Sequence, residues 1–192
     1  MPIHGIDPQC SIALKEWAVI CAALSRGTQS ILLRKGGIDE GPAGFRPEHR
    51  LFWLLPTAYH QSPDSLQSDA HQLLTSTRRD FRPGEIRIDH LAAVDEVYHL
   101  EREEDLDKLH GLHIWSDETV HQRFHYRAPG LFVMLLRLHR IISPAVLPEW
   151  PELAGCRSWV QLPGPLSTAD AAPVLSDEAW SAAAEAVRQR LR

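Results

Sequence analysis

Two short apolar runs joined by a glycine- and proline-rich stretch place the strongest constraint on the fold. The first run, 31–33, leads directly into Arg34 and Lys35, and the second, 51–55, directly follows Arg50. Apolar runs of this length, bounded by turn-forming residues, are typical of buried strands. Because charged side chains stand at the strand ends beside apolar core residues, the layout predicts a sheet with a functional site at one edge.

Segments of helical and strand character follow one another in an irregular order. Helices are expected over about 12–25, 63–78 and 101–107, after Ser116, and after Ser176. Strands are expected over 28–35, 51–56, 131–142 and 157–162, with one or two more between residues 86 and 98. Residues 36–47 and 163–175, rich in glycine and proline, are interpreted as connections. This order favours an α+β fold with a mostly antiparallel, curled sheet and flanking helices.

The length of 192 residues suits one domain. Residues 1–165 are expected to form a single α+β domain, and residues 166–192 an extended connection and a C-terminal helix packed on it. The apolar run 17–24 is far shorter than the roughly 20 residues that cross a bilayer as a helix. The three cysteines are widely separated and form no C-x-x-C pair. We therefore expect a cytoplasmic protein whose cysteines are reduced thiols, without membrane contact or cofactor.

The net charge of -5 hides an uneven distribution along the chain. Residues 85–118 carry eleven acids and three bases, whereas residues 119–148 carry four arginines and no acid. Residues 26–50 carry five bases and three acids. A chain with more acidic than basic residues is not expected to bind nucleic acid in general, because such binding requires many basic contacts with phosphates. Any polyanion should bind at a local patch, with a shallow salt dependence.

A basic and imidazole-rich patch near the strand ends is the first candidate site. Its expected ligand-binding residues are Arg34, Lys35, His49, Arg50, Trp53, His60, Gln61 and Arg137. The expected ligand is a nucleic acid, a nucleotide or a related anion, held by arginine forks and by the N-terminus of the helix that follows Gln61. Trp53 would supply stacking. The alternative is that these are solvated charges that discourage pairing at sheet edges.

Arg137 belongs to the longest expected strand and allows two interpretations. It either reaches into the ligand cleft or pairs with a carboxylate such as Asp95 or Glu96 to hold the sheet together. The sequence leaves open whether it shares one cleft with Arg34 and Arg50.

Histidine spacing offers a metal site, which the neighbouring residues disfavour. His121 and His125 lie one helical turn apart, an arrangement that can bind one ion. The segment reads HQRFH, so Gln122 stands where an H-E-x-x-H zinc protease has its glutamate base. Arg123 also lies between the two imidazoles and would repel a cation. No metal is therefore expected.

A hydrolase or nuclease is the competing functional class. Its candidate catalytic residues are Glu48, His49 and His60, with an imidazole acting as a general base. The run that begins at Gly36 and Gly37 is similar to the start of a pyrophosphate-hydrolase box, but the carboxylates that would hold magnesium do not follow it. Cys156 is interpreted as a small core residue. A third class is an accessory domain that binds a protein partner through its acidic segment 95–107.

Several ordered motifs resemble the bacterial family known as domain of unknown function 1802. They are ALKEWAVICAAL, LLRKGGIDEG, FWLLPTAYHQ, HIWSDETVHQRF, LLRLHRIISP and GCRSWVQL. The resemblance covers roughly residues 10–165, leaves out the C-terminal helix and implies no activity. A weaker likeness is to PUA-like domains of the ASCH and EVE kinds, which implies a small curled barrel with a ligand cleft. Several such domains recognise nucleic acid, so this likeness favours binding over catalysis.

Overall fold

The strands of the chain form one curled sheet. The computed structural model describes residues 7–35, 46–80, 82–153, 155 and 157–192. In these residues the strands are β1 Gln9–Trp17, β2 Ile31–Arg34, β3 Leu51–Thr57, β4 Glu85–Leu100, β5 Leu131–Pro148, β6 Trp159–Ser167 and β7 Ala171–Pro173. Their order is β2-β5-β4-β3-β1-β6, and β7 pairs with β5. All neighbours are antiparallel except β1 and β3. The mostly antiparallel α+β fold expected from sequence is thus confirmed.

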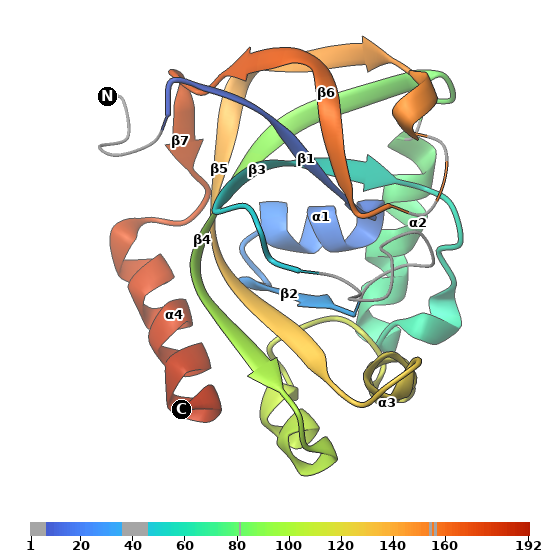
Figure 1. Cartoon of the computed structure of the whole chain (residues 1–192), viewed down its shortest axis with the longest axis vertical. Helices are drawn as coiled ribbons and strands as arrows, with labels where there is room; N and C mark the ends of the chain where they lie inside the picture. The colour runs from blue at the N-terminus through green and yellow to red at the C-terminus, as the bar shows by residue number, and fades with distance from the viewer. Residues whose placement is uncertain (1–6, 36–45, 81, 154, 156) are drawn as a thin grey trace.

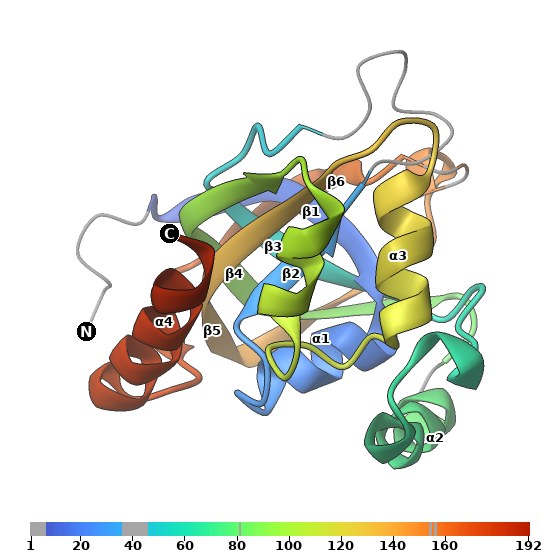
Figure 2. The same ribbon diagram turned by 90° about the horizontal axis from the view of Figure 1, so that it is seen from below.

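Four α-helices among the described residues pack around or within this sheet. They are α1 Ala18–Ser25, α2 His71–Asp80, α3 Asp117–His125 and α4 Asp177–Leu191. The 3-10 helices are η1 Pro63–Ser65, η2 Ser68–Ala70, η3 Glu103–Leu109 and η4 Pro151–Leu153. The apolar α1 lies inside the curl of the sheet (Figure 1). Seen from below, α4 and α3 lie on opposite sides of the strands (Figure 2). The sheet does not close into a barrel, because β2 and β6 end the strand order.

The helix expected over 12–25 is a strand followed by a helix. Residues 9–17 form β1, which pairs with β3 on one side and β6 on the other, and only 18–25 are helical. Ala13 and Leu14 are both fully buried, on opposite faces of this strand. The apolar residues 12–14 are followed closely by the apolar segment of α1, and periodicity alone cannot separate a short buried strand from a buried helix.

The longest strand is β5, as the sequence predicted, and it pairs with β4 along most of its length. The predicted elements between residues 86 and 98 are one strand, β4, with irregular register on either side of Asp89 and Asp95. Bulges of this kind bend a strand and increase its twist. They let β4 and β5 follow the curl of the sheet from one end to the other (Figure 1).

Alternate residues of the central strands enter two separate apolar clusters. Phe52 and Leu54 pack in the larger cluster with α1, whereas Trp53 and Leu55 pack in the smaller one. The indole of Trp53 is fully buried and donates a 2.9 Å hydrogen bond to the carbonyl of Cys10. The expectation that Trp53 stacks on a ligand is therefore wrong, because its ring belongs to the core.

The C-terminal residues are part of this packing. Ala184 and Val187 of α4 are buried in the larger cluster, and the Ser176 hydroxyl caps the helix by accepting a 3.2 Å hydrogen bond from the Ala179 amide. Residues 163–175, expected to be an extended connection, contain the end of β6 and all of β7. Their prolines lie on edge strands, where a missing amide donor costs no ladder hydrogen bond. No helix in the described part of the chain is long and apolar enough to cross a membrane.

Candidate functional site

One large pocket of about 980 Å³ opens where β1, β2 and β3 end beside α3. Its cationic lining residues are Lys15, Arg34, Lys35, Arg123 and Arg157, and its carboxylates are Glu16 and Glu149. Its aromatic lining residues are Trp17, Tyr59, Tyr126 and Trp150. The lining also includes His60 and Ser158. A pocket of this size, part aromatic and part charged, can hold a ligand as large as a nucleotide.

Strand pairing explains why these side chains meet. The parallel register of β1 and β3 sets Lys15 opposite Leu55 and Glu16 opposite Pro56, so both strands end together at the pocket. The antiparallel pairing with β6 brings Ser158 alongside, and the Lys15 amide donates a 2.9 Å hydrogen bond to its carbonyl.

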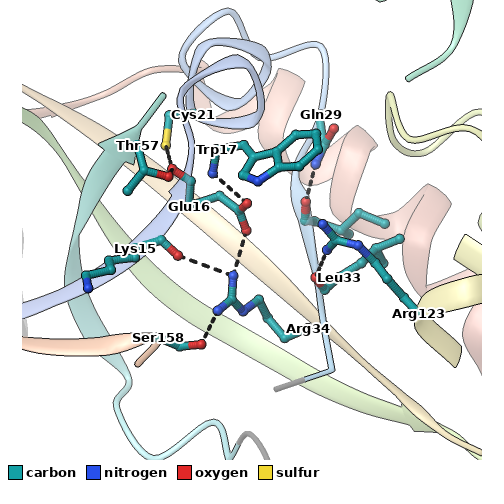
Figure 3. A network of polar contacts seen from close by, with 11 residues as sticks. Lys15, Glu16, Trp17, Cys21, Gln29, Leu33, Arg34, Thr57, Arg123 and Ser158 are labelled. Carbon is teal, nitrogen blue, oxygen red and sulfur yellow. Dashed lines mark hydrogen bonds and ion pairs between the residues drawn. The ribbon is translucent and has the colours of Figure 1, made fainter. Parts of the chain in front are cut away.

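A nearly buried ion pair forms the floor of the pocket. The Glu16 carboxylate lies 3.0 Å from the Arg34 guanidinium, and their side chains are only 2% and 12% exposed. Arg34 also donates to the Lys15 carbonyl at 3.2 Å and to the Ser158 hydroxyl (Figure 3). The second Glu16 oxygen accepts a 2.7 Å hydrogen bond from the Trp17 amide. Both charges are paired and hydrogen-bonded in a region of low dielectric constant. The Glu16–Arg34 pair therefore holds a fixed position at the floor of the pocket.

Arg123 of α3 forms the wall next to this floor. Its guanidinium lies 3.7 Å from the centre of the Trp115 ring and donates a 3.3 Å hydrogen bond to the Leu33 carbonyl. Burial lowers the pKa of Arg123 to about 10, with Glu16 opposing the shift and Arg34 adding to it. The side chain therefore stays cationic at neutral pH.

Two lysines also belong to the cationic lining and are held by backbone carbonyls. The Lys15 ammonium donates to Leu153 at 2.6 Å and to Gly155 at 3.1 Å. The Lys35 ammonium donates to Gly130 at 2.5 Å and to Ala128. Partial burial lowers the pKa of Lys35. These contacts fix both ammonium groups at the pocket wall.

The sequence matches the family model described as Domain of unknown function (DUF1802) over residues 13–186. The chain belongs to this family. The match extends beyond the region of the resemblance noted from sequence and includes most of α4. No curated protein matches the chain.

Among solved structures, this DUF1802 chain is similar to ASCH from Zymomonas mobilis. The identity is 11% and the TM-score 0.40, with 66% of each chain covered. A mutant of the same ASCH protein gives 11% identity and a TM-score of 0.41, with 79% of this chain and 88% of that one covered. The ASCH likeness expected from sequence is thus found, and at this level it implies no activity.

Of the expected ligand-binding residues, the structure brings Arg34, Lys35 and His60 to the pocket. Gln61 lies beside it as a buried structural residue, whose side-chain oxygen accepts a 3.0 Å hydrogen bond from the Val19 amide in the first turn of α1. His60 has a positive φ of 62°, a conformation that non-glycine residues seldom adopt.

The remaining expected residues lie outside the pocket lining. His49 packs edge-on against Trp159 with ring centres 4.8 Å apart, and Glu48 and Arg50 are exposed. The proposed catalytic cluster of Glu48, His49 and His60 therefore does not gather around this pocket. Residues 36–45, with the Gly36-Gly37 turn, and Cys156 lie outside the described residues.

Arg137 belongs to the other side of the sheet. Its guanidinium pairs with Asp177 of α4 and lies 5.1 Å from the centre of the Trp180 ring. The idea that it shares a cleft with Arg34 is wrong, because its side chain faces α4. The idea that it pairs with Asp95 or Glu96 is also wrong, since Arg188 takes that role.

The acidic segment 95–107 is largely paired within the chain. Arg188 of α4 contacts Asp95 and lies 2.5 Å from Glu96, and Asp105 pairs with Arg102 at 3.0 Å. Hydrogen bonds from Tyr98 and then Arg188 lower the pKa of Glu96 to about 2. Much of this segment therefore holds α4 and η3 in place.

Sequence reasoning missed Glu16, Arg123 and Ser158. Glu16 was assigned to a helix, where it would be an ordinary solvent-facing residue. Its position at the end of an apolar run was the available signal, since a strand ending there brings a carboxylate to the edge of the sheet. Nothing in the sequence pairs it with Arg34.

Proposed function

We propose that this DUF1802 chain binds a nucleotide, or one nucleotide unit of a single-stranded nucleic acid, in the pocket between β1, β2, β3 and α3. The observation that supports it is the combination of aromatic rings and cationic groups in one pocket of about 980 Å³.

The aromatic side chains supply the recognition of a planar group. Tyr59 and Tyr126 line the pocket and are 67% and 42% exposed, so a ligand can reach both rings. Base stacking on an aromatic ring contributes about 1–3 kcal/mol and tolerates any base. These two rings are therefore the proposed stacking surface.

The cationic side chains supply the recognition of phosphate. Lys15 and Lys35 are already positioned by backbone carbonyls, and Arg157 is exposed at the same pocket. A charge-assisted hydrogen bond from such a group to phosphate is stronger than a neutral one. Arg34 has a structural role in this proposal. It donates hydrogen bonds to Glu16, Ser158 and the Lys15 carbonyl and so holds the residues at the bottom of the pocket together.

The overall charge of -5 limits the extent of the interaction. With only a few cations at one pocket, binding should neutralise about two phosphates and have a correspondingly small salt slope. This favours a short ligand over a long duplex.

Titration of the protein with mononucleotides and short single-stranded DNA and RNA at low salt tests the proposal. Trp17 and Trp150 line the pocket and provide a fluorescence signal. Tyr59→Ala and Arg157→Ala should each weaken binding by about tenfold, which corresponds to the loss of one stack or one charged contact. Arg137→Ala, on the α4 side, is the matched control and should leave the affinity unchanged. Absence of binding at low salt, or equal affinity in all variants, rejects the proposal.

A further inference from the structure

We propose that Glu103, His121 and His125 form a binding site for one divalent transition-metal ion of the zinc type. The three side chains lie outside the nucleotide pocket and come from two elements, η3 and α3. Within the part of the chain described here, they form the group of histidine, cysteine and acidic side chains that can hold a metal, with ligand atoms all within 4.8 Å of one another.

The distances fit coordination to one centre. The Glu103 Oε1 lies 2.9 Å from His121 Nδ1 and 3.1 Å from His125 Nε2. Ligands about 2.1 Å from a metal and at right angles to each other are about 3.0 Å apart, and tetrahedral ligands about 3.4 Å. The two imidazole nitrogens lie within 4.8 Å of each other, so an ion is accommodated once they are no more than about 4.2 Å apart, twice the metal–ligand distance.

Local structure explains how the ligands meet. His121 and His125 are one turn apart on α3, so their imidazoles lie on the same face of the helix. The acidic first turn of η3 places Glu103 against this face. Between them, the two elements supply the two-histidine, one-carboxylate ligand set common among metal sites.

The charge of Arg123, which argues against a metal site in the sequence, does not face the two imidazoles in the structure. The Arg123 guanidinium is directed toward Trp115 and the Leu33 carbonyl, on the pocket side of α3. Nearby Arg102 pairs with Glu104 and Asp105, and Lys108 pairs with Asp105. On the other side, Asp107 and His121 line a neighbouring hollow of about 340 Å³ together with Asp117. The surroundings therefore contain carboxylates that favour a cation.

The ligand types select the metal. Two imidazoles favour zinc, cobalt or nickel over magnesium and calcium, which take oxygen ligands. Glu103 and His125 are exposed, so water can complete the coordination. The ion would join η3 to α3, the helix whose opposite side contributes Arg123 and Tyr126 to the pocket.

Titration of untagged, chelator-treated full-length protein with Zn²⁺ and Co²⁺ tests the site. We expect one ion per chain, visible d–d absorption with Co²⁺, and at least about a tenfold loss of affinity in His121→Ala, His125→Ala and the milder Glu103→Gln, since even a residue behind a ligand costs this much. His71→Ala removes an exposed imidazole on α2 and should bind as the unchanged protein does. Because the three ligands are surface residues, circular dichroism should show folded variants.

Two results overturn the proposal. One is Zn²⁺ affinity that is the same in His125→Ala and His71→Ala. The other is a Co²⁺ spectrum identical to that of the aqueous ion at one equivalent. Neither result affects the nucleotide proposal, which rests on different residues.

Discussion

The carboxylate of Glu16 and the guanidinium of Arg34 are 3.0 Å apart at the floor of the pocket, and both are almost withdrawn from water. Removing one partner leaves the other as a buried charge without compensation, which costs more than the pair contributes. Replacing Glu16 therefore tests whether its ion pair with Arg34 stabilises the floor of the pocket.

We expect Glu16→Ala to lower the free energy of unfolding by about 2–4 kcal/mol, somewhat less than for a fully enclosed pair because Arg34 retains some solvent contact. Glu149→Ala, which removes an exposed carboxylate from the same pocket, should change it by less than about 0.5 kcal/mol. Urea unfolding measures both. Equal effects of the two substitutions would contradict the paired floor.

The buried His113 should make stability depend on pH. Burial lowers the pKa of His113 to about 4, whereas an unfolded histidine has a pKa of about 6.5. Between these values the unfolded chain binds the extra proton, so the free energy of unfolding falls as the pH drops from about 6.5 to 4. At pH 5 the loss should be about 2 kcal/mol relative to pH 7.

The matched variant is His113→Asn. The His113 Nδ1 accepts a 3.2 Å hydrogen bond from the Trp115 amide, and an asparagine oxygen can take over this role without titrating. Urea unfolding at pH 7 and pH 5 should show a smaller loss in the variant. Parallel losses in both proteins would show that His113 is not the group responsible.

Gly27 ends α1 in a conformation that only glycine adopts easily. It has a φ of +68°, and an added Cβ would clash with the end of the Leu175 side chain. Gly84 has a φ of +81° but open space around it. We expect Gly27→Ala to cost about 2 kcal/mol or more and Gly84→Ala about 1 kcal/mol, because only the first adds a clash to the backbone strain. Thermal and urea unfolding check the order, and a larger loss for Gly84→Ala would reverse the argument.

Arg188 fastens α4 to β4 through Asp95 and Glu96. Arg188→Ala should therefore speed amide hydrogen exchange across residues 177–191, and the effect should shrink at high salt because exposed charge pairs are screened. Gln189→Ala is the control, since Gln189 bonds only to Glu185 of the same helix among the described residues. Equal exchange in both variants would mean that apolar packing alone holds α4.

Local sequence signals predicted much of the fold. Ser116 and Ser176 cap their helices as expected, and the long apolar segment from Leu131 forms β5. These features depend on neighbouring residues, which a single sequence displays. The start of α1 was misplaced, because the identity of residues 9–17 as a strand depends on partners near residues 53 and 160.

The site was less predictable for the same reason. The sequence predicts that Arg34 and Lys35 stand at a strand end, and there they line the pocket, yet Glu16 and Ser158 reach Arg34 only through pairing of distant strands. Arg137 was misassigned because a side chain on a strand can face either side of the sheet, and the register that decides this is not local.

The position of β1 between β3 and β6 affects how the protein is made. Residues 9–17 leave the ribosome well before the strand that pairs with one side of them, residues 159–167. Until then β1 has an uncovered edge, the kind of surface that invites pairing with other chains. The complete set of pairs around β1 therefore forms only after β6 has been synthesised and docks.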